Sequence, residues 1–166
     1  MSFLYINTGQ SLILSLFKMQ TRKITILIAI LIGTGLAQAD CSVGATSVSF
    51  GAYDVFSGAP NNNGIGTITL SCHGVGPSRI VTLSSGNSSD YTSRYMNNQI
   101  LSGHIIYNLY TNSARTLIWG DGSGSSSTVH VSDSVFTTLS IYGEIPANQD
   151  VSVGYYTDSI TVAIHF

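Results

Sequence analysis

Two cysteines, Cys41 and Cys72, are the residues of this 166-residue chain that are best suited to covalent chemistry. Both come after a segment that predicts export, and an even number of cysteines in an exported protein predicts a disulfide. Closing a loop of this length would stabilise the fold by about 3 to 4 kcal/mol in the chain-entropy model. A metal or redox site has less support, because the chain has no Cys-x-x-Cys and only His73 adjoins a cysteine.

Acid–base and metal chemistry have weak candidates. The acids Glu144 and Asp150 bracket a short loop and could form a carboxylate pair, although we interpret them as turn-capping surface residues. The stretch 121–125 resembles the start of a calcium loop but lacks the further acids and the closing glutamate. No Gly-x-Ser-x-Gly or His-Glu-x-x-His motif occurs, and the four histidines fall in different segments: His73, His104, His130 and His165. The sequence therefore predicts no enzyme, no cofactor and no metal.

Trp119 is the best candidate for a ligand contact. A tryptophan at the end of a strand, beside the Gly-Ser loop that follows it, could stack on a sugar ring or on a host surface. We favour packing in the core for this residue. A self-contained secreted module that recognises carbohydrate or a surface through its loops stays as the alternative function.

The first 39 residues predict a secretory signal peptide. Lys18, Arg22 and Lys23 precede an apolar run of 13 residues over 24–36, and Ala37-Gln38-Ala39 follows as a small-x-small cleavage site. The run is too short for a membrane span, which needs about 20 residues. A start at Met19 would give a signal peptide of ordinary length. We expect residues 40–166 to form one exported domain without membrane insertion.

The composition after residue 39 argues against binding to nucleic acids and to anionic membranes. Residues 40–166 contain three arginines, no lysine and all eight acids, so the net charge is −5 with neutral histidines. Nucleic acids and anionic membranes need clustered basic side chains, and these three arginines are dispersed. We expect neither partner.

Short β-rich runs separated by Gly, Asn and Ser predict an all-β antiparallel sandwich, and we find no amphipathic helix. The last run alternates in period two, with Ile160, Val162, Ile164 and Phe166 on one face, as a half-buried strand requires. The expected strands are 41–50, 65–72, 79–83, 104–110, 116–119, 135–142 and 159–166.

Seven short motifs together resemble the spore coat protein U family, which includes subunits of archaic, Csu-type chaperone-usher pili. They are Cys41-Ser42-Val43, Phe50-Gly51-Ala52-Tyr53, Ser71-Cys72, Tyr107-Asn108-Leu109-Tyr110, Trp119-Gly120-Asp121-Gly122, Tyr142-Gly143-Glu144-Ile145-Pro146 and Gly154-Tyr155-Tyr156-Thr157-Asp158.

The resemblance implies an immunoglobulin-like sandwich that lacks its final strand. In such subunits a periplasmic chaperone lends a strand, and another pilus subunit replaces it after delivery to the outer-membrane usher. The chain would then be a structural subunit of a surface pilus or coat, with a role in adhesion or biofilm formation. Ile160, Val162, Ile164 and Phe166 would form one edge of the acceptor groove, and the disulfide would join the first two strands. Burying four or five guest side chains would gain roughly 10 kcal/mol before ordering costs.

One departure from the family pattern concerns the donor segment. Polymerising subunits carry an alternating apolar stretch before the first cysteine, whereas cleavage after Ala39 would leave only Asp40. We therefore expect a subunit that receives a strand without donating one in this way, in a terminal or accessory position. The adhesion target and the identities of chaperone and usher do not follow from the sequence.

Overall fold

The computed structural model describes residues 40–73, 78–132 and 135–166; the predicted signal peptide lies outside these residues. The described chain contains strands and no helix, and so no helix there could cross a membrane. The strands are β1 (Asp40–Ala45), β2 (Ile65–His73), β3 (Arg79–Leu83), β4 (Arg94–Asn98), β5 (His104–Tyr110), β6 (Val129–Val131), β7 (Phe136–Glu144), β8 (Tyr156–Thr157) and β9 (Val162–His165).

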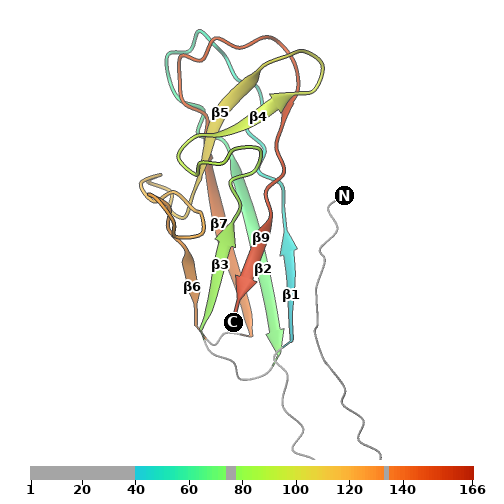
Figure 1. The fold of residues 1–166 in the computed structure, drawn as a ribbon, viewed down its shortest axis with the longest axis vertical. Coiled ribbons are helices and arrows are strands. Elements are labelled where there is room, and N and C mark those ends of the chain that lie inside the picture. Colours follow the sequence, from blue (N-terminus) through green and yellow to red (C-terminus); the bar gives the residue numbers. More distant parts are fainter. Residues whose placement is uncertain (1–39, 74–77, 133–134) are drawn as a thin grey trace, which may run out of the picture. The chain divides into compact units, whose positions relative to one another are not determined.

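These strands form two antiparallel sheets. The larger sheet has the order β1-β2-β7-β5-β4-β8, and the smaller has the order β6-β3-β9. Figure 1 shows the smaller sheet in front of the β1-β2-β7 part of the larger one. The predicted all-β antiparallel sandwich is confirmed.

β2 lies between β1 and β7 in the larger sheet, and its side chains alternate between buried and more exposed positions. Ile68, Leu70 and Cys72 are at most 2 % exposed and face the other sheet, whereas Thr67 and Thr69 face outward. The strand is paired on both edges, with β1 and with β7. Period-two burial of this kind fixes the register, since a slip of one residue would expose the whole apolar set.

The two sheets share one core. Val81 and Leu83 of β3, Val131 of β6 and Leu109 of β5 belong to the same buried cluster as the inward side chains of β2. Trp119 is fully buried in this cluster, and its indole Nε1–H donates to the carbonyl of Val81 at 3.1 Å. The packing interpretation of Trp119 is thus confirmed.

Several boundaries differ from the sequence prediction. The first strand ends at Ala45 rather than at residue 50, β9 begins at Val162 rather than 159, and 116–119 forms only isolated bridges. β4, β6 and β8 were not predicted. β4 reads Arg-Tyr-Met-Asn-Asn and has no apolar alternation, so its strand conformation depends on tertiary contacts.

Arg94 supplies those contacts for β4. Its guanidinium is fully buried and donates to the carbonyls of Ser84 (3.1 and 2.9 Å) and Trp119 (2.6 Å) and to Oδ1 of Asn108 (2.8 Å). Burial lowers the pKa of Arg94 from its usual value. The cation is stabilised by this fork of hydrogen bonds, which joins β4 to β5 and to the loop after β3.

The core account predicts the effect of truncating β2. Ile68→Ala should destabilise the domain by about 2 to 5 kcal/mol, because it leaves a cavity between the sheets. The outward-facing Thr138→Val should change stability by less than about 0.5 kcal/mol. Urea unfolding of both variants tests this, and equal losses would contradict the assignment of inner and outer faces.

Candidate functional site

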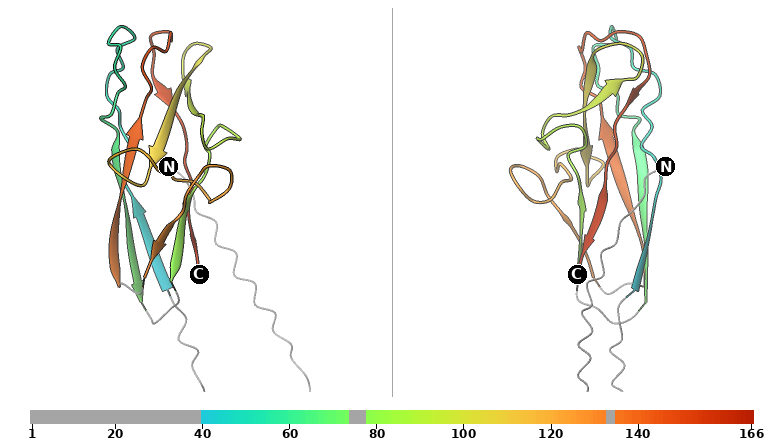
Figure 2. Two further views of the ribbon diagram at one scale, coloured as in Figure 1. Left: turned by 90° about the vertical axis from the view of Figure 1, so that its left-hand side faces the viewer. Right: turned by 45° about the vertical axis from the view of Figure 1, so that its right-hand side comes forward.

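Two strand edges on one side of the sandwich lack partners. Among the described residues, β9 pairs only with β3 and β1 pairs only with β2. Figure 1 shows β9 as the front strand nearest to β1, and the right-hand view of Figure 2 brings this side of the domain forward. We call these two free edges together the β1–β9 seam.

The inward side chains of the seam are incompletely covered. On β9, Val162 and Ile164 lie opposite the buried Leu83 and Val81, so they face the core, yet both are only half-buried. On β1, Val43 lies opposite the buried Leu70 and is 38 % exposed. Each of these side chains lies beside a buried apolar side chain of the neighbouring strand in its own sheet.

The other two predicted edge residues lie in the same phase as Val162 and Ile164. Ile160 precedes β9 and packs half-buried against the core, while Phe166 follows β9 and is 63 % exposed. All four predicted residues therefore lie along one edge of the seam. No single one of them is fully buried.

An apolar hollow of about 890 Å³ extends this site toward the other end of the domain. Its walls are residues 47–56, which follow β1, and residues 151–157, which lead toward β9. Met96, Ile105 and Ile145 contribute to the lining. Because the walls continue the two edges of the seam, we treat this upper hollow as part of the same site.

Glycines position the wall of the upper hollow that follows β1. A Cβ at Gly143 would lie 2.6 Å from Cζ of Phe50, and one at Gly64 would overlap the same ring, so glycine there lets the ring lie against the strands. The Phe50 ring also meets Tyr107 edge-on, with centroids 5.8 Å apart. Asn61 Nδ2 donates to the carbonyls of Phe50 and Ala52, each at 3.0 Å, which fixes the backbone of this wall.

Asp158 fixes the opposite wall where the chain approaches β9. Its Oδ1 accepts the N–H groups of Asn87 (2.9 Å) and Ser159 (2.7 Å), and its Oδ2 accepts the hydroxyl of Tyr107 (2.7 Å). Burial, together with this carboxylate, raises the pKa of Tyr107, so the hydroxyl stays protonated and donates. Two hydrogen bonds between Ser84 and Thr161, each 2.9 Å, continue the support.

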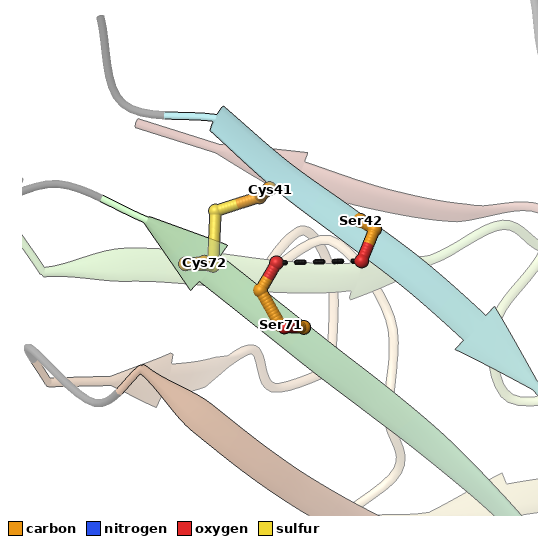
Figure 3. Close-up of a disulfide and its surroundings, with 4 residues drawn as sticks. All are labelled: Cys41, Ser42, Ser71 and Cys72. Atoms are coloured by element: carbon orange, nitrogen blue, oxygen red, sulfur yellow. Dashed lines mark hydrogen bonds between the residues drawn. A yellow bond between two sulfur atoms is a disulfide. The ribbon is translucent and has the colours of Figure 1, made fainter.

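The disulfide fixes β1. Cys41 and Cys72 lie directly opposite each other on β1 and β2, and their sulfur atoms are 2.13 Å apart (Figure 3). The neighbouring Ser42 hydroxyl donates to the Ser71 carbonyl at 3.4 Å. A six-residue edge strand that is paired on one side only is thus held covalently in place.

The remaining sequence candidates do not assemble into a reactive centre. His73, His104, His130 and His165 are all exposed, and the described part of the chain holds no cluster of three metal-ligating side chains. Asp121 Oδ1 accepts the hydroxyl (2.6 Å) and the N–H (2.8 Å) of Ser123, which lowers the pKa of Asp121 and caps its own turn. Glu144 ends β7, and Asp150 is exposed.

Sequence reasoning missed part of the site. Val43 was not singled out, although its alternation with Cys41 could have indicated an inward position. Met96 and Ile105 come from β4 and β5, and no sequence pattern brings them to residues 47–56.

Comparison with known proteins gives consistent results. The family model of the Spore Coat Protein U domain matches residues 28–163. Protein U of Myxococcus xanthus is 26 % identical over 140 residues, which are 76 % of this chain and 77 % of that protein.

Two solved pilus proteins are also similar. One is in the CsuC–CsuE chaperone–tip adhesion subunit pre-assembly complex from the archaic chaperone-usher Csu pili of Acinetobacter baumannii. That match has a TM-score of 0.55 and 21 % identity, and it covers 78 % of this chain but only 40 % of the matched one. The other is the minor tip subunit HdaB of the E. coli Hda pilus, with a TM-score of 0.43, 12 % identity and coverage of 74 % and 79 %. The predicted immunoglobulin-like fold is confirmed by the first structure.

Removing the disulfide should loosen β1. The double variant Cys41→Ala, Cys72→Ala should lose about 3 kcal/mol of unfolding free energy, because the unfolded chain regains the entropy of an open loop. Urea unfolding measures this loss, and reduction of the wild type should reproduce it. An unchanged midpoint would show that the disulfide does not stabilise the strand.

Proposed function

The chain belongs to the Spore Coat Protein U domain family, and from this premise we propose that it is an exported structural subunit of a surface pilus or coat. Its activity is to accept a guest β-strand in the β1–β9 seam. The observation that carries this proposal is the pair of unpartnered edges whose inward apolar side chains, Val43, Val162 and Ile164, are left partly exposed.

The physics of the seam fits strand addition. A guest strand would pair its backbone with the free edge of β9 and place alternate side chains over Val43 and Ile164 and into the upper hollow. Backbone pairing supplies affinity to any extended chain, whereas the apolar positions select the sequence. Four or five buried side chains would gain roughly 10 kcal/mol before ordering costs.

The proposed partners are a periplasmic chaperone, an outer-membrane usher and other pilus subunits. The similar Csu structure is a pre-assembly complex of a chaperone with a tip adhesion subunit, which supports a chaperone as the first donor. The reaction is a non-covalent exchange of strands, so we propose no enzymatic activity. Residues 1–39 would direct export, and the final location would be the cell surface.

A charge in the seam should block the guest strand. Val43→Asp places a carboxylate at an inward position that is already 38 % exposed, so the free subunit should fold, while strand binding should fall by about tenfold or more. Ser42→Asp, one residue away on the outward face, is the matched control.

The assay uses a synthetic peptide with the alternating apolar segment of a co-encoded subunit and follows thermal unfolding. Wild type and Ser42→Asp should be stabilised by about 2.7 kcal/mol at a peptide concentration 100 times Kd. A wild-type subunit that is indifferent to every such peptide would contradict the proposal.

A second feature, which shares residues 51–56 and 151–155 with the walls of the upper hollow, supports a role in adhesion. Three loops at one end of the domain, 51–60, 99–103 and 146–155, lie together in both views of Figure 2. They expose large apolar side chains to an unusual degree for a soluble domain. These are Phe56 (92 %), Val153 (90 %), Tyr155 (76 %), Ile100 (71 %) and Leu101 (49 %).

Backbone and side-chain hydrogen bonds hold these loops in place. Gln99 N–H donates to the Tyr155 carbonyl at 2.9 Å, and the Tyr53 hydroxyl donates to the Pro146 carbonyl at 2.9 Å. Gln149 bonds both backbone groups of Ile106 in β5, at 2.7 and 2.8 Å. We propose that this apolar loop end contacts apolar surfaces. Recognition of carbohydrate through Trp119 is not favoured, since that side chain is fully buried.

Replacing three apolar loop residues tests the adhesive role. The variant Phe56→Ser, Val153→Ser, Tyr155→Ser should adsorb to polystyrene at least about tenfold more weakly, because each side chain contributes roughly 1 kcal/mol or more of apolar contact. The control Ile65→Ser, Val135→Ser, Leu117→Ser removes three exposed apolar side chains elsewhere. Equal adsorption of both variants would contradict a role specific to the loop end.

A further inference from the structure

A buried cation with two unpaired nitrogen atoms lies near the end of the seam that is opposite the upper hollow. Arg79 is the first residue of β3 and is 1 % exposed. Its Nε and Nη1 atoms have no hydrogen-bond partner among the described residues. The guanidinium stays charged in proteins, and leaving it buried and unpaired is costly. Such a group points to an acceptor that the described domain does not supply.

The other two arginines among the described residues are both hydrogen-bonded. Arg94 is equally buried and makes the four hydrogen bonds described above. Arg115 donates to the carbonyls of Gly143 (3.2 Å), Ser113 (3.1 Å) and Asn62 (2.5 Å). Arg79 differs from both, although it is as inaccessible as Arg94.

The register places Arg79 one strand away from the seam, because β9 lies between β3 and the free edge. It lies in the same phase as the buried Val81 and Leu83, so its side chain is on the inner face of the front sheet. Ile80 pairs with His165, and one step further the antiparallel register brings Arg79 across from Phe166. Figure 1 shows the start of β3, the end of β9 and the start of β1 at the same end of the domain. A guest strand along β9 would end in this region.

We propose that Arg79 binds a carboxylate of the guest strand, from an Asp or Glu at the inward position beside Phe166. This inference rests on the strand-accepting function proposed above. The backbone carbonyls of a strand lie in the plane of its sheet and bond to neighbouring strands, so an acceptor that reaches inward must be a side chain. A carboxylate neutralises the guanidinium and matches its paired donors, whereas an amide leaves the charge uncompensated.

The pair would also fix the register of the guest strand. Sliding the guest by one residue turns the carboxylate outward and leaves Arg79 buried and unpaired again. The apolar positions of the seam distinguish inward from outward faces, but they do not distinguish slips of two residues. A single charge pair at one end supplies that missing distinction.

The experiment compares synthetic nine-residue peptides of alternating Val and Thr that carry Glu, Gln or Leu at the first or the last inward position. Calorimetry measures their affinity for the wild-type subunit. At one of the two positions, we expect the Glu peptide to bind about tenfold more tightly than its Gln counterpart. The variant Arg79→Met should remove this difference. Arg115→Met is the matched control and should retain it.

The remaining outcomes are distinguishable. Equal affinity of Glu, Gln and Leu peptides for the wild type would overturn this inference while leaving strand acceptance intact, and it requires no variant to fold. Failure of all peptides to bind would overturn both proposals. Asp133, two residues after β6 in the sequence and outside the described residues, is a rival partner. Asp133→Asn should leave the Glu preference unchanged; a preference that arises only in this variant would assign Arg79 to Asp133.

Discussion

An inward apolar side chain on an edge strand needs a neighbour on both sides, and the β1–β9 seam supplies a neighbour on only one. The rear sheet extends to β1, whereas the front sheet stops at β9. Val43 on one edge and Val162 and Ile164 on the other therefore keep contact with solvent.

Each edge of the seam is held in place by bonds to the rest of the domain. Cys41–Cys72 fixes β1 from behind, and Asp158 with Ser84 fixes the chain that enters β9. The Phe50 ring packs against Gly64 and Gly143 in the segment that follows β1. A site whose walls are already ordered loses less entropy when a strand is added, so more of the burial energy becomes affinity. The polar groups thus set the geometry and the apolar groups supply the driving force.

The sequence was informative wherever burial alternates along one strand. Short β-rich runs between turn formers located β2, β3, β5, β7 and the last strand, and period-two alternation placed Ile160, Val162, Ile164 and Phe166 on one face. It failed for β4, whose inward residues Arg94 and Asn98 are polar and are buried only because distant carbonyls and amides satisfy them. It also gave no sign of the upper hollow, since Met96 and Ile105 reach residues 47–56 through tertiary folding. The sequence around Arg79 does not predict its unpaired nitrogen atoms either, because the lack of a partner is visible only in the folded domain.

Hydrogen–deuterium exchange along β9 and β1 tests the central claim most directly. In the isolated subunit, amides that bond to β3 and β2 should be protected, while the amides that face the seam should exchange rapidly. Assembly with the chaperone, or addition of a guest peptide, should protect the seam-facing amides of β9 without changing the others. Protection of those amides in the isolated subunit would show that the sandwich is already closed, and this account of strand acceptance would be wrong.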